Sequence, residues 1–209
     1  YAFFTWGLLE LYETNFELRY LQEAIALNDM MRTHFWDAED GAFYFTPDDG
    51  ETLLVRQKEI DDGAIPSGNA VAMANLLRIG RITGNTTYEE EAATIGDAFA
   101  GQIAQAPSAF THLMTALNFG VGPSYEIVIV GDAQASDTQA MLAALRSRFV
   151  PKATNLTRDT FGIIGLLVII CVTNVKIAQS EERSRRWLKV RFSVGVDVTL
   201  YVCHAAVRN

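Results

Sequence analysis

Over most of the first 122 residues, apolar side chains recur at steps of three and four, which is the spacing of one face of an α-helix. This periodicity predicts helices at about 1–12, 17–33, 70–82, 88–103 and 108–119. Short turns with Gly or Asn separate these segments. Helices of similar length joined by short turns predict stacked antiparallel helical hairpins and a mainly α chain.

One insert breaks the helical pattern. The aromatic run Phe43–Phe45 stands between Gly41 and Pro47, and the apolar run Leu53–Val55 follows after an Asp-Asp-Gly turn signal. Two short extended runs joined by such a turn are typical of a β-hairpin. The sequence therefore predicts a short β-hairpin at one end of the helices.

The stretch from Val55 to Ala70 concentrates charged and amide side chains with two glycines and a proline. Pro66 can begin a helix without losing a hydrogen bond, and Gly68 leaves room for a ligand or a neighbouring backbone. Free N–H groups at that helix start would attract an anion or a sugar hydroxyl. Two interpretations stay open: a binding site, or a well-capped acidic loop that holds two helices in register.

The pattern changes after residue 122. The β-branched run 126–132 predicts a strand buried on both faces, and a helix to about residue 148 follows it. We therefore divide the chain into helical hairpins at 1–122, a small β-α unit at 123–157 and a divergent tail at 158–209. The apolar run 161–172 is shorter than the roughly 20 residues that span a bilayer, so a buried strand or helix is favoured over a membrane anchor.

Composition excludes several classes of protein. The net charge is −8, and residues 1–150 carry 21 acidic against eight basic side chains, so nucleic-acid binding is not expected. The two cysteines, Cys171 and Cys203, form no C-x-x-C pair, so the default interpretation is a cytoplasmic context or plain buried thiols. The three histidines are scattered, so the sequence predicts no metal site and no cofactor.

Four segments carry a resemblance to a known family: Tyr1–Glu13, Phe35–Asp37, Asp62–Asn69 and Ile127–Asp132. In this order and spacing they resemble the thioredoxin-domain-containing proteins related to spermatogenesis-associated protein 20. The resemblance implies an N-terminal thioredoxin-like domain joined to an α/α toroid similar to six-hairpin glycosidases and N-acylglucosamine 2-epimerases. This chain would then hold the later hairpins of a partial toroid and a small α/β C-terminal segment. Redox activity does not carry over, because the thioredoxin-like domain and its cysteines are absent from the chain.

The resemblance also implies a site, because toroids of this class bind carbohydrate where the loops between hairpins converge. By position, Trp36 and Tyr44 would stack on a sugar face. Arg56 and Lys58 would hold a carboxylate or hydroxyl groups.

The catalytic candidates are Asp62, as general acid or base, and His34, as the proton-shuttling base that an epimerisation needs. Ser67 and Asn69 would orient hydroxyl groups. Glycoside hydrolysis usually needs two separated carboxylates, and the adjacent Asp61 and Asp62 are not a convincing pair.

Two function classes follow. The first is a carbohydrate-active toroid, epimerase-like or hydrolase-like, with a carbohydrate ligand; the chain alone is expected to be inactive because it supplies only part of the toroid mouth. The second is a non-catalytic interaction module that presents partners to the N-terminal thioredoxin-like domain of a longer protein. A mouth closed by salt bridges from Arg56 and Lys58 would favour the module.

Overall fold

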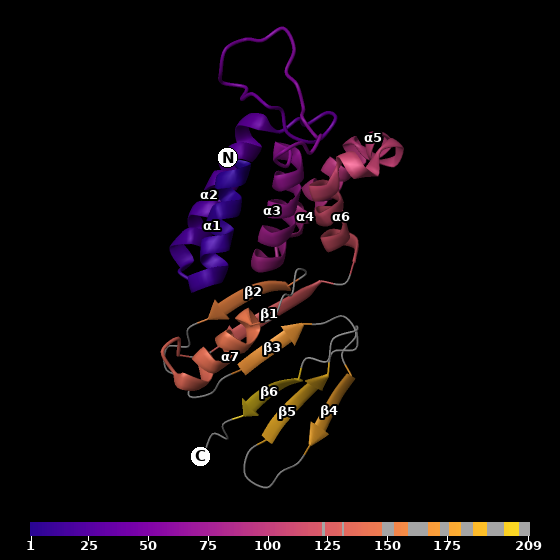
Figure 1. The fold of residues 1–209 in the computed structure, drawn as a ribbon. Coiled ribbons are helices and arrows are strands. Elements are labelled where there is room, and N and C mark those ends of the chain that lie inside the picture. Colours follow the sequence, from indigo (N-terminus) through magenta and orange to yellow (C-terminus); the bar gives the residue numbers. More distant parts are fainter. Residues whose placement is uncertain are drawn as a thin grey trace. The chain divides into compact units, whose positions relative to one another are not determined.

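The computed structural model describes residues 1–122, 124–130 and 132–147, and beyond them the backbone of five strands between residues 153 and 204. The chain divides into two compact units, Tyr1–Pro123 and Ser124–Asn209, which are described separately below. Helices make up most of the first unit, and this confirms the prediction of a mainly α chain (Figure 1).

The first unit is built in two layers of helices. Its elements are α1 (Ala2–Asn15), α2 (Leu18–Phe35), α3 (Gly68–Thr83), α4 (Thr86–Ala98), α5 (Ala100–Gln105), the 3-10 helix η1 (Pro107–Ala109) and α6 (Thr111–Val121). Helix α3 packs between α1 and α6, and these three form one layer. Helix α2 packs on α1 and α4 packs on α3 to form the other layer. Turns of two residues make α1–α2 and α3–α4 antiparallel pairs.

The helix ends follow local chemistry. Helix α1 is capped at its C-terminal end by Phe16 and α3 by Gly84, both in the left-handed conformation that commonly terminates helices. The side chains of Ser67 and Asn85 accept hydrogen bonds from the first turns of α3 and α4. The single helix predicted at 88–103 is wrong in one respect: the backbone leaves the helical conformation at Phe99, which is buried, and α5 starts after it.

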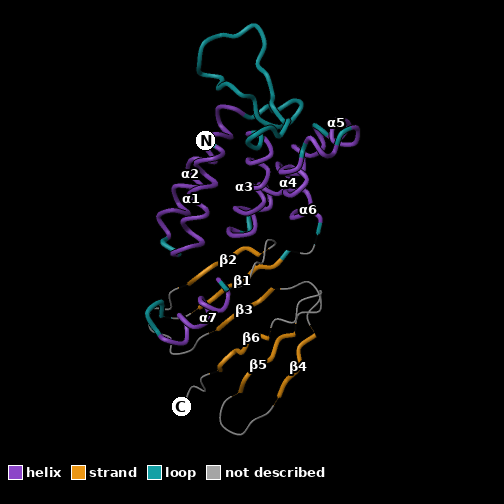
Figure 2. The backbone as a smooth tube through the Cα atoms, viewed as in Figure 1, coloured by secondary structure: helices purple, strands orange, loops and turns teal. Residues whose placement is uncertain are grey.

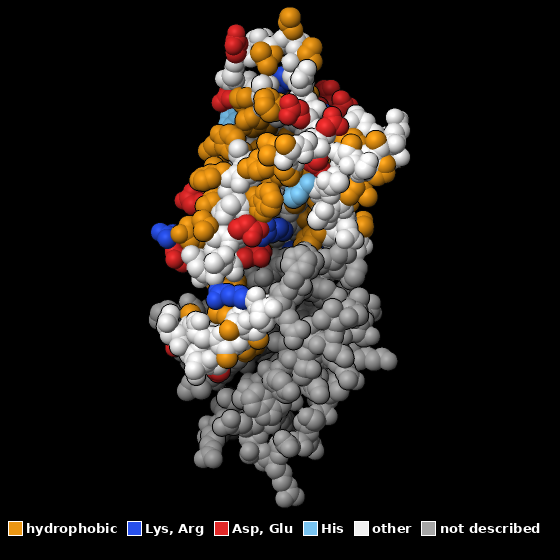
Figure 3. Space-filling model, viewed as in Figure 1, with side chains coloured by type: hydrophobic (Ala, Val, Ile, Leu, Met, Phe, Trp, Pro, Cys, Tyr) orange, Lys and Arg blue, Asp and Glu red, His pale blue; other side chains and the backbone are white. Residues whose placement is uncertain are grey.

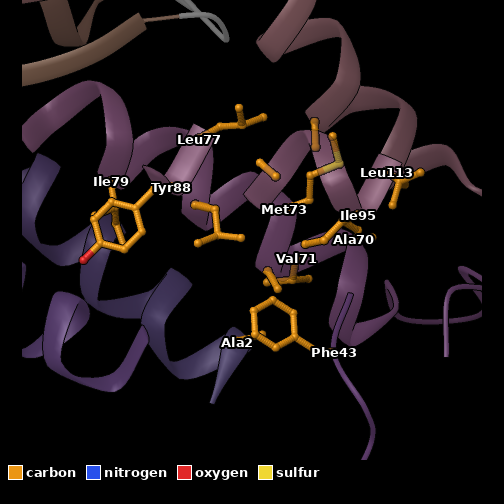
Figure 4. Packing of buried hydrophobic residues seen from close by; sticks show 14 of the residues in the cluster. Ala2, Phe43, Ala70, Val71, Met73, Leu77, Ile79, Tyr88, Ile95 and Leu113 are labelled. Carbon is orange, nitrogen blue, oxygen red and sulfur yellow. The ribbon is translucent and has the colours of Figure 1, made fainter. Parts of the chain in front are cut away.

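Helix α3 is the centre of the core. Ten of its 16 residues are buried, including Val71, Leu76 and Ile79, because other helices cover it on several sides. Ile95 of α4 and Leu113 of α6 are fully buried in the same cluster (Figure 4). A helix that is apolar nearly all round is typical of a buried position.

The predicted β-hairpin is wrong. In the long loop between α2 and α3 (Figure 2), Phe43 pairs instead with Trp36 through one isolated antiparallel bridge. The N–H of Tyr44 donates to the carbonyl of Phe35. Residues 53–55 form no strand. The bridge forms because residues 38–42 make a tight reversal that ends with Gly41 and Ala42 at positive φ, so Phe43 returns directly to the end of α2.

We expect Gly41→Ala to lower the free energy of unfolding by about 2 kcal/mol. Gly41 has φ of 74°, and left-handed geometry costs a residue with a Cβ about 1–2 kcal/mol. The added Cβ would also lie 2.5 Å from Cγ2 of Thr94, so that side chain must move. Urea unfolding measures the change. Gly7→Ala is the matched control, because nothing lies within 4 Å of its Cβ position in α1, and it should be neutral or stabilising. Equal stability of the two variants would contradict the prediction.

The second unit contains two sheets. Strands β1 (Tyr125–Val130) and β2 (Ala153–Arg158) pair in parallel, and α7 (Ser136–Arg146) lies between them in sequence. Strand β3 (Leu167–Cys171) pairs antiparallel with the other side of β1, which gives the order β2-β1-β3. A second, antiparallel sheet has the order β4-β5-β6, formed by Lys176–Ser180, Arg186–Arg191 and Thr199–His204.

Apart from β3, the apolar run 161–172 lies outside the described residues. Among the helices that are described, none combines the length and apolar character needed to cross a membrane.

Candidate functional site

The loop from residue 36 to 67 contains a buried carboxylate. Asp37, two residues after the end of α2, is only 6% exposed. Its Oδ2 accepts hydrogen bonds from Lys58 Nζ and from the Tyr44 hydroxyl, both at 2.6 Å. Its Oδ1 accepts from the backbone N–H groups of Glu39 and Asp40. The hydrogen bond from Lys58, followed by that from Tyr44, holds the pKa of Asp37 well below its usual range, so this carboxylate is ionised at neutral pH.

The two basic side chains that were predicted to hold a substrate, Arg56 and Lys58, make contacts within the loop and with the end of α2. Arg56 lies over the ring of Tyr44, with its guanidinium carbon 4.1 Å from the ring centroid. The same guanidinium donates to the carbonyls of Thr46 at 2.5 Å and His34 at 3.3 Å. Lys58 donates to the carbonyl of Gly41 at 2.7 Å as well as to the carboxylate of Asp37. The hydrogen bond to Asp37 raises the pKa of the Tyr44 hydroxyl, so Tyr44 stays a donor at neutral pH.

Asn69 anchors the same loop to the first turn of α3. Its side chain is 3% exposed and is fully used. Oδ1 accepts from the N–H of Phe43 at 2.8 Å, and Nδ2 donates to the carbonyls of Phe43 at 2.9 Å and Glu59 at 2.8 Å. The amide therefore pairs with Phe43 as a neighbouring strand would. Asn69 holds two separate parts of the loop against the helix.

Asp62 and Ser67 form a second set of contacts. Oδ1 of Asp62 accepts from the N–H of Ser67 at 2.8 Å, and Oδ2 accepts from the N–H of His112 at 2.7 Å. The N–H of Asp62 donates to the carbonyl of Ala109 at 2.9 Å. Ser67 caps α3 by accepting from the N–H of Ala70. One oxygen of Asp62 therefore holds the start of α3, and the other joins the loop to the start of α6.

The remaining candidates lie at the end of α2. The ring of Trp36 packs edge-on against Phe43, with centroids 5.0 Å apart. His34 Nδ1 lies 3.0 Å from an oxygen of Asp48 and 3.6 Å from one of Asp49. Trp36 thus lies with Phe43 at the base of the loop, and Asp62 lies with Ser67. The two catalytic candidates do not share partners, because His34 contacts Asp48 and Asp49. A catalytic role for either residue stays a prediction.

One group of residues was missed by the sequence reasoning. The ring of Trp6 in α1 lies 5.2 Å from the ring of His112 in α6, and its Nε1 donates to Glu10. Nε2 of His112 is buried and has no hydrogen-bond partner within the part of the chain that is described. The periodic pattern assigned Trp6 to the helical core, and a lone histidine far along the chain carries no signal of this contact. Hydrophobic side chains gather on the visible face of the first unit (Figure 3).

No model of a protein family matches the chain. Spermatogenesis-associated protein 20 of Rattus norvegicus and of Homo sapiens are each 34% identical to it over 160 residues, which is 76% of this chain and 20% of the relative. An uncharacterized protein of Caenorhabditis elegans is 30% identical over 155 residues, or 74% of this chain and 20% of that protein. The chain is therefore homologous to part of these proteins, and it spans about a fifth of the length of the curated relatives that it matches.

Proposed function

Since the chain is homologous to about a fifth of spermatogenesis-associated protein 20, we propose that it is a non-catalytic helical module that packs against other protein segments. The observation that supports this proposal is that the polar side chains of the loop between α2 and α3 bond to the chain itself. The polar side-chain groups of Lys58, Asp62 and Asn69 bond to the chain itself. Arg56 donates to two backbone carbonyls, although its Nε has no partner among the described residues.

These internal contacts weigh against a ligand role for the same groups. A ligand that took over Lys58 or Asn69 would have to separate them from Asp37, Phe43 and Glu59. Each buried polar group left without a partner costs about 1–3 kcal/mol. A sugar hydroxyl gains little net free energy in such an exchange, because it is already hydrogen-bonded to water. The hydrogen bonds of the loop are therefore better suited to holding the loop in place than to binding a sugar.

An exposed apolar face on α1 supplies a surface for packing. Phe4 is 65% exposed, Phe3 is 43% exposed, and Leu11 lies on the same side of the helix. The side turned away from these residues carries the buried Thr5, Leu9 and Tyr12. Contiguous exposed apolar residues mark interaction surfaces. We propose that further helical hairpins of a longer protein cover this face and continue the α1–α3–α6 layer, as an α/α toroid would require.

Carbohydrate binding is a second candidate, and the Trp6 group favours it more than the loop does. An aromatic ring beside the carboxylate of Glu10 offers a stacking face and a hydrogen-bond acceptor in one place. Saturable binding of a sugar to the chain would identify this function. Loss of that binding in Trp6→Ala would place the binding site at Trp6.

Light-scattering chromatography of the purified chain tests the module. We expect association that rises with protein concentration, because the α1 face lacks a covering partner when the chain is alone, and we expect the double variant Phe3→Ser/Phe4→Ser to shift the population toward monomer. Leu18→Ser is the matched control, because Leu18 is an exposed apolar residue at the start of α2. A sharp monomer peak of the parent chain at all concentrations, or sugar binding lost in Trp6→Ala, would contradict the proposal.

A further inference from the structure

A cluster of three potential metal ligands lies where the loop returns to the end of α2. It consists of His34 in the last turn of α2 and of Asp48 and Asp49 in the loop. The Nδ1 atom of His34 is 3.0 Å from Oδ1 of Asp48 and 3.6 Å from Oδ2 of Asp49, and the three ligand atoms all lie within 4.8 Å of one another. Neither aspartate takes part in the Asp37 network or in the contacts of Asp62.

These separations suit one small divalent cation. Ligand atoms about 2.1 Å from a zinc ion are about 3.0 Å apart at a right angle, about 3.4 Å apart in a tetrahedron and about 4.2 Å apart on opposite sides. The two distances from His34 fall within that span. One imidazole nitrogen with two carboxylate oxygens is a ligand set for zinc or a similar transition metal, whereas magnesium prefers oxygen alone.

The backbone holds the ligands in place before any ion arrives. The N–H of Asp48 donates to the carbonyl of His34 at 2.9 Å, and Arg56 donates to the same carbonyl. Arg56 is also close enough to lower the pKa of Asp48, although less than His34 does, and its charge opposes a cation. The positive charge of Arg56 therefore lowers the affinity for a cation. Its guanidinium does not fill the space between the three ligands, because it contacts the Tyr44 ring and the carbonyl of Thr46.

We propose that His34, Asp48 and Asp49 bind one divalent transition-metal ion of the zinc type, with water completing the coordination on the exposed side. The ion takes the place of a proton on Nδ1 of His34, and one oxygen of each aspartate completes the protein ligand set. It ties the loop tip to the end of α2. The role of the ion is structural, since it holds the loop segment that leads to the exposed residues 53–55.

Titration calorimetry of the untagged chain with zinc chloride at pH 7.5 tests this site. We expect one saturable binding event, weakened at least tenfold in each of His34→Gln and Asp49→Asn. Glu51→Gln is the matched control, because Glu51 is an exposed acid on the same loop outside the cluster, and it should leave the affinity unchanged. Magnesium chloride should give no comparable event, and the zinc affinity should fall at acid pH because protons compete for the imidazole.

A second readout separates this site from the cysteines of the chain. Cobalt(II) bound to nitrogen and oxygen ligands gives weak visible bands, without the intense near-ultraviolet absorption of a thiolate complex. We expect the weak bands alone, and we expect His34→Gln to abolish them while its thermal melt stays cooperative. Binding that is unchanged in His34→Gln, a thiolate signature, or no saturable heat would overturn the proposal.

Discussion

Asp37→Asn is expected to lower the free energy of unfolding by about 3 kcal/mol at neutral pH, since breaking a largely buried ion pair leaves the other charge unpaired. The change removes the negative partner of Lys58, whose ammonium group lies 2.6 Å from the carboxylate. It also weakens the acceptor of the Tyr44 hydroxyl. The Asn Oδ1 still accepts from the backbone of residues 39 and 40, so the local turn is preserved.

The effect of this substitution should depend on pH in a defined direction. Folding lowers the pKa of Asp37, mainly through the hydrogen bond from Lys58, relative to an unfolded value of about 3.9. A lowered pKa stabilises the fold above the unfolded value, and that contribution is lost as the pH falls toward the folded value. The difference between parent and Asp37→Asn should therefore be constant near pH 7 and shrink below about pH 4.

Urea unfolding at pH 7 and at pH 3 measures both parts of this prediction. Asp40→Asn is the matched control, because Asp40 is an exposed carboxylate in the same turn, and it should change stability by less than about 0.5 kcal/mol. A difference that stays the same at both pH values would show that the charge of Asp37 does not carry the effect.

The second large effect is expected for Asn69→Ala, which should also cost about 3 kcal/mol. The side chain satisfies three backbone groups, the N–H and carbonyl of Phe43 and the carbonyl of Glu59, in a buried position. Each buried group left without a partner costs about 1–3 kcal/mol, and water that enters the vacated space recovers part of this. Thermal and urea unfolding measure the loss.

Asn85→Ala provides the comparison for Asn69→Ala. Asn85 is exposed and makes a single capping contact, to the N–H of Thr87, so its removal should cost about 1 kcal/mol. If both variants lost the same amount, the anchoring role of Asn69 would be refuted.

The helices could be predicted from the sequence because their signals are local. In α3, the apolar residues Leu76, Leu77 and Ile79 and the terminal Gly84 lie within a few turns of one another. The break at Phe99 could not be predicted in this way. An aromatic residue at that position fits the helical period, and only the packing of the whole unit turns it into the core.

The polar loop could be recognised from the sequence, but its hydrogen-bond partners could not. The concentration of polar residues near position 60 is visible in the sequence, and so is the helix start at Ser67. Their partners are distant: Asn69 binds the backbone of Phe43, and Asp62 binds the N–H of His112. Such pairings depend on the approach of α2, α3 and α6, so residues that read as free ligands turn out to be joined to one another.

The side chain of Asn69 binds both Phe43 and Glu59, and this limits where the loop between α2 and α3 can change in length during evolution. Because Asn69 closes the loop at its base, residues inserted near position 51 lengthen only the tip beyond it. The entropy cost of a flexible loop grows slowly, by about 0.6 kcal/mol for each doubling of length. Insertions and deletions at the tip are therefore tolerated with the helices unchanged. Those between Trp36 and Phe43 instead change the reversal that lets these two residues pair at the base of the loop.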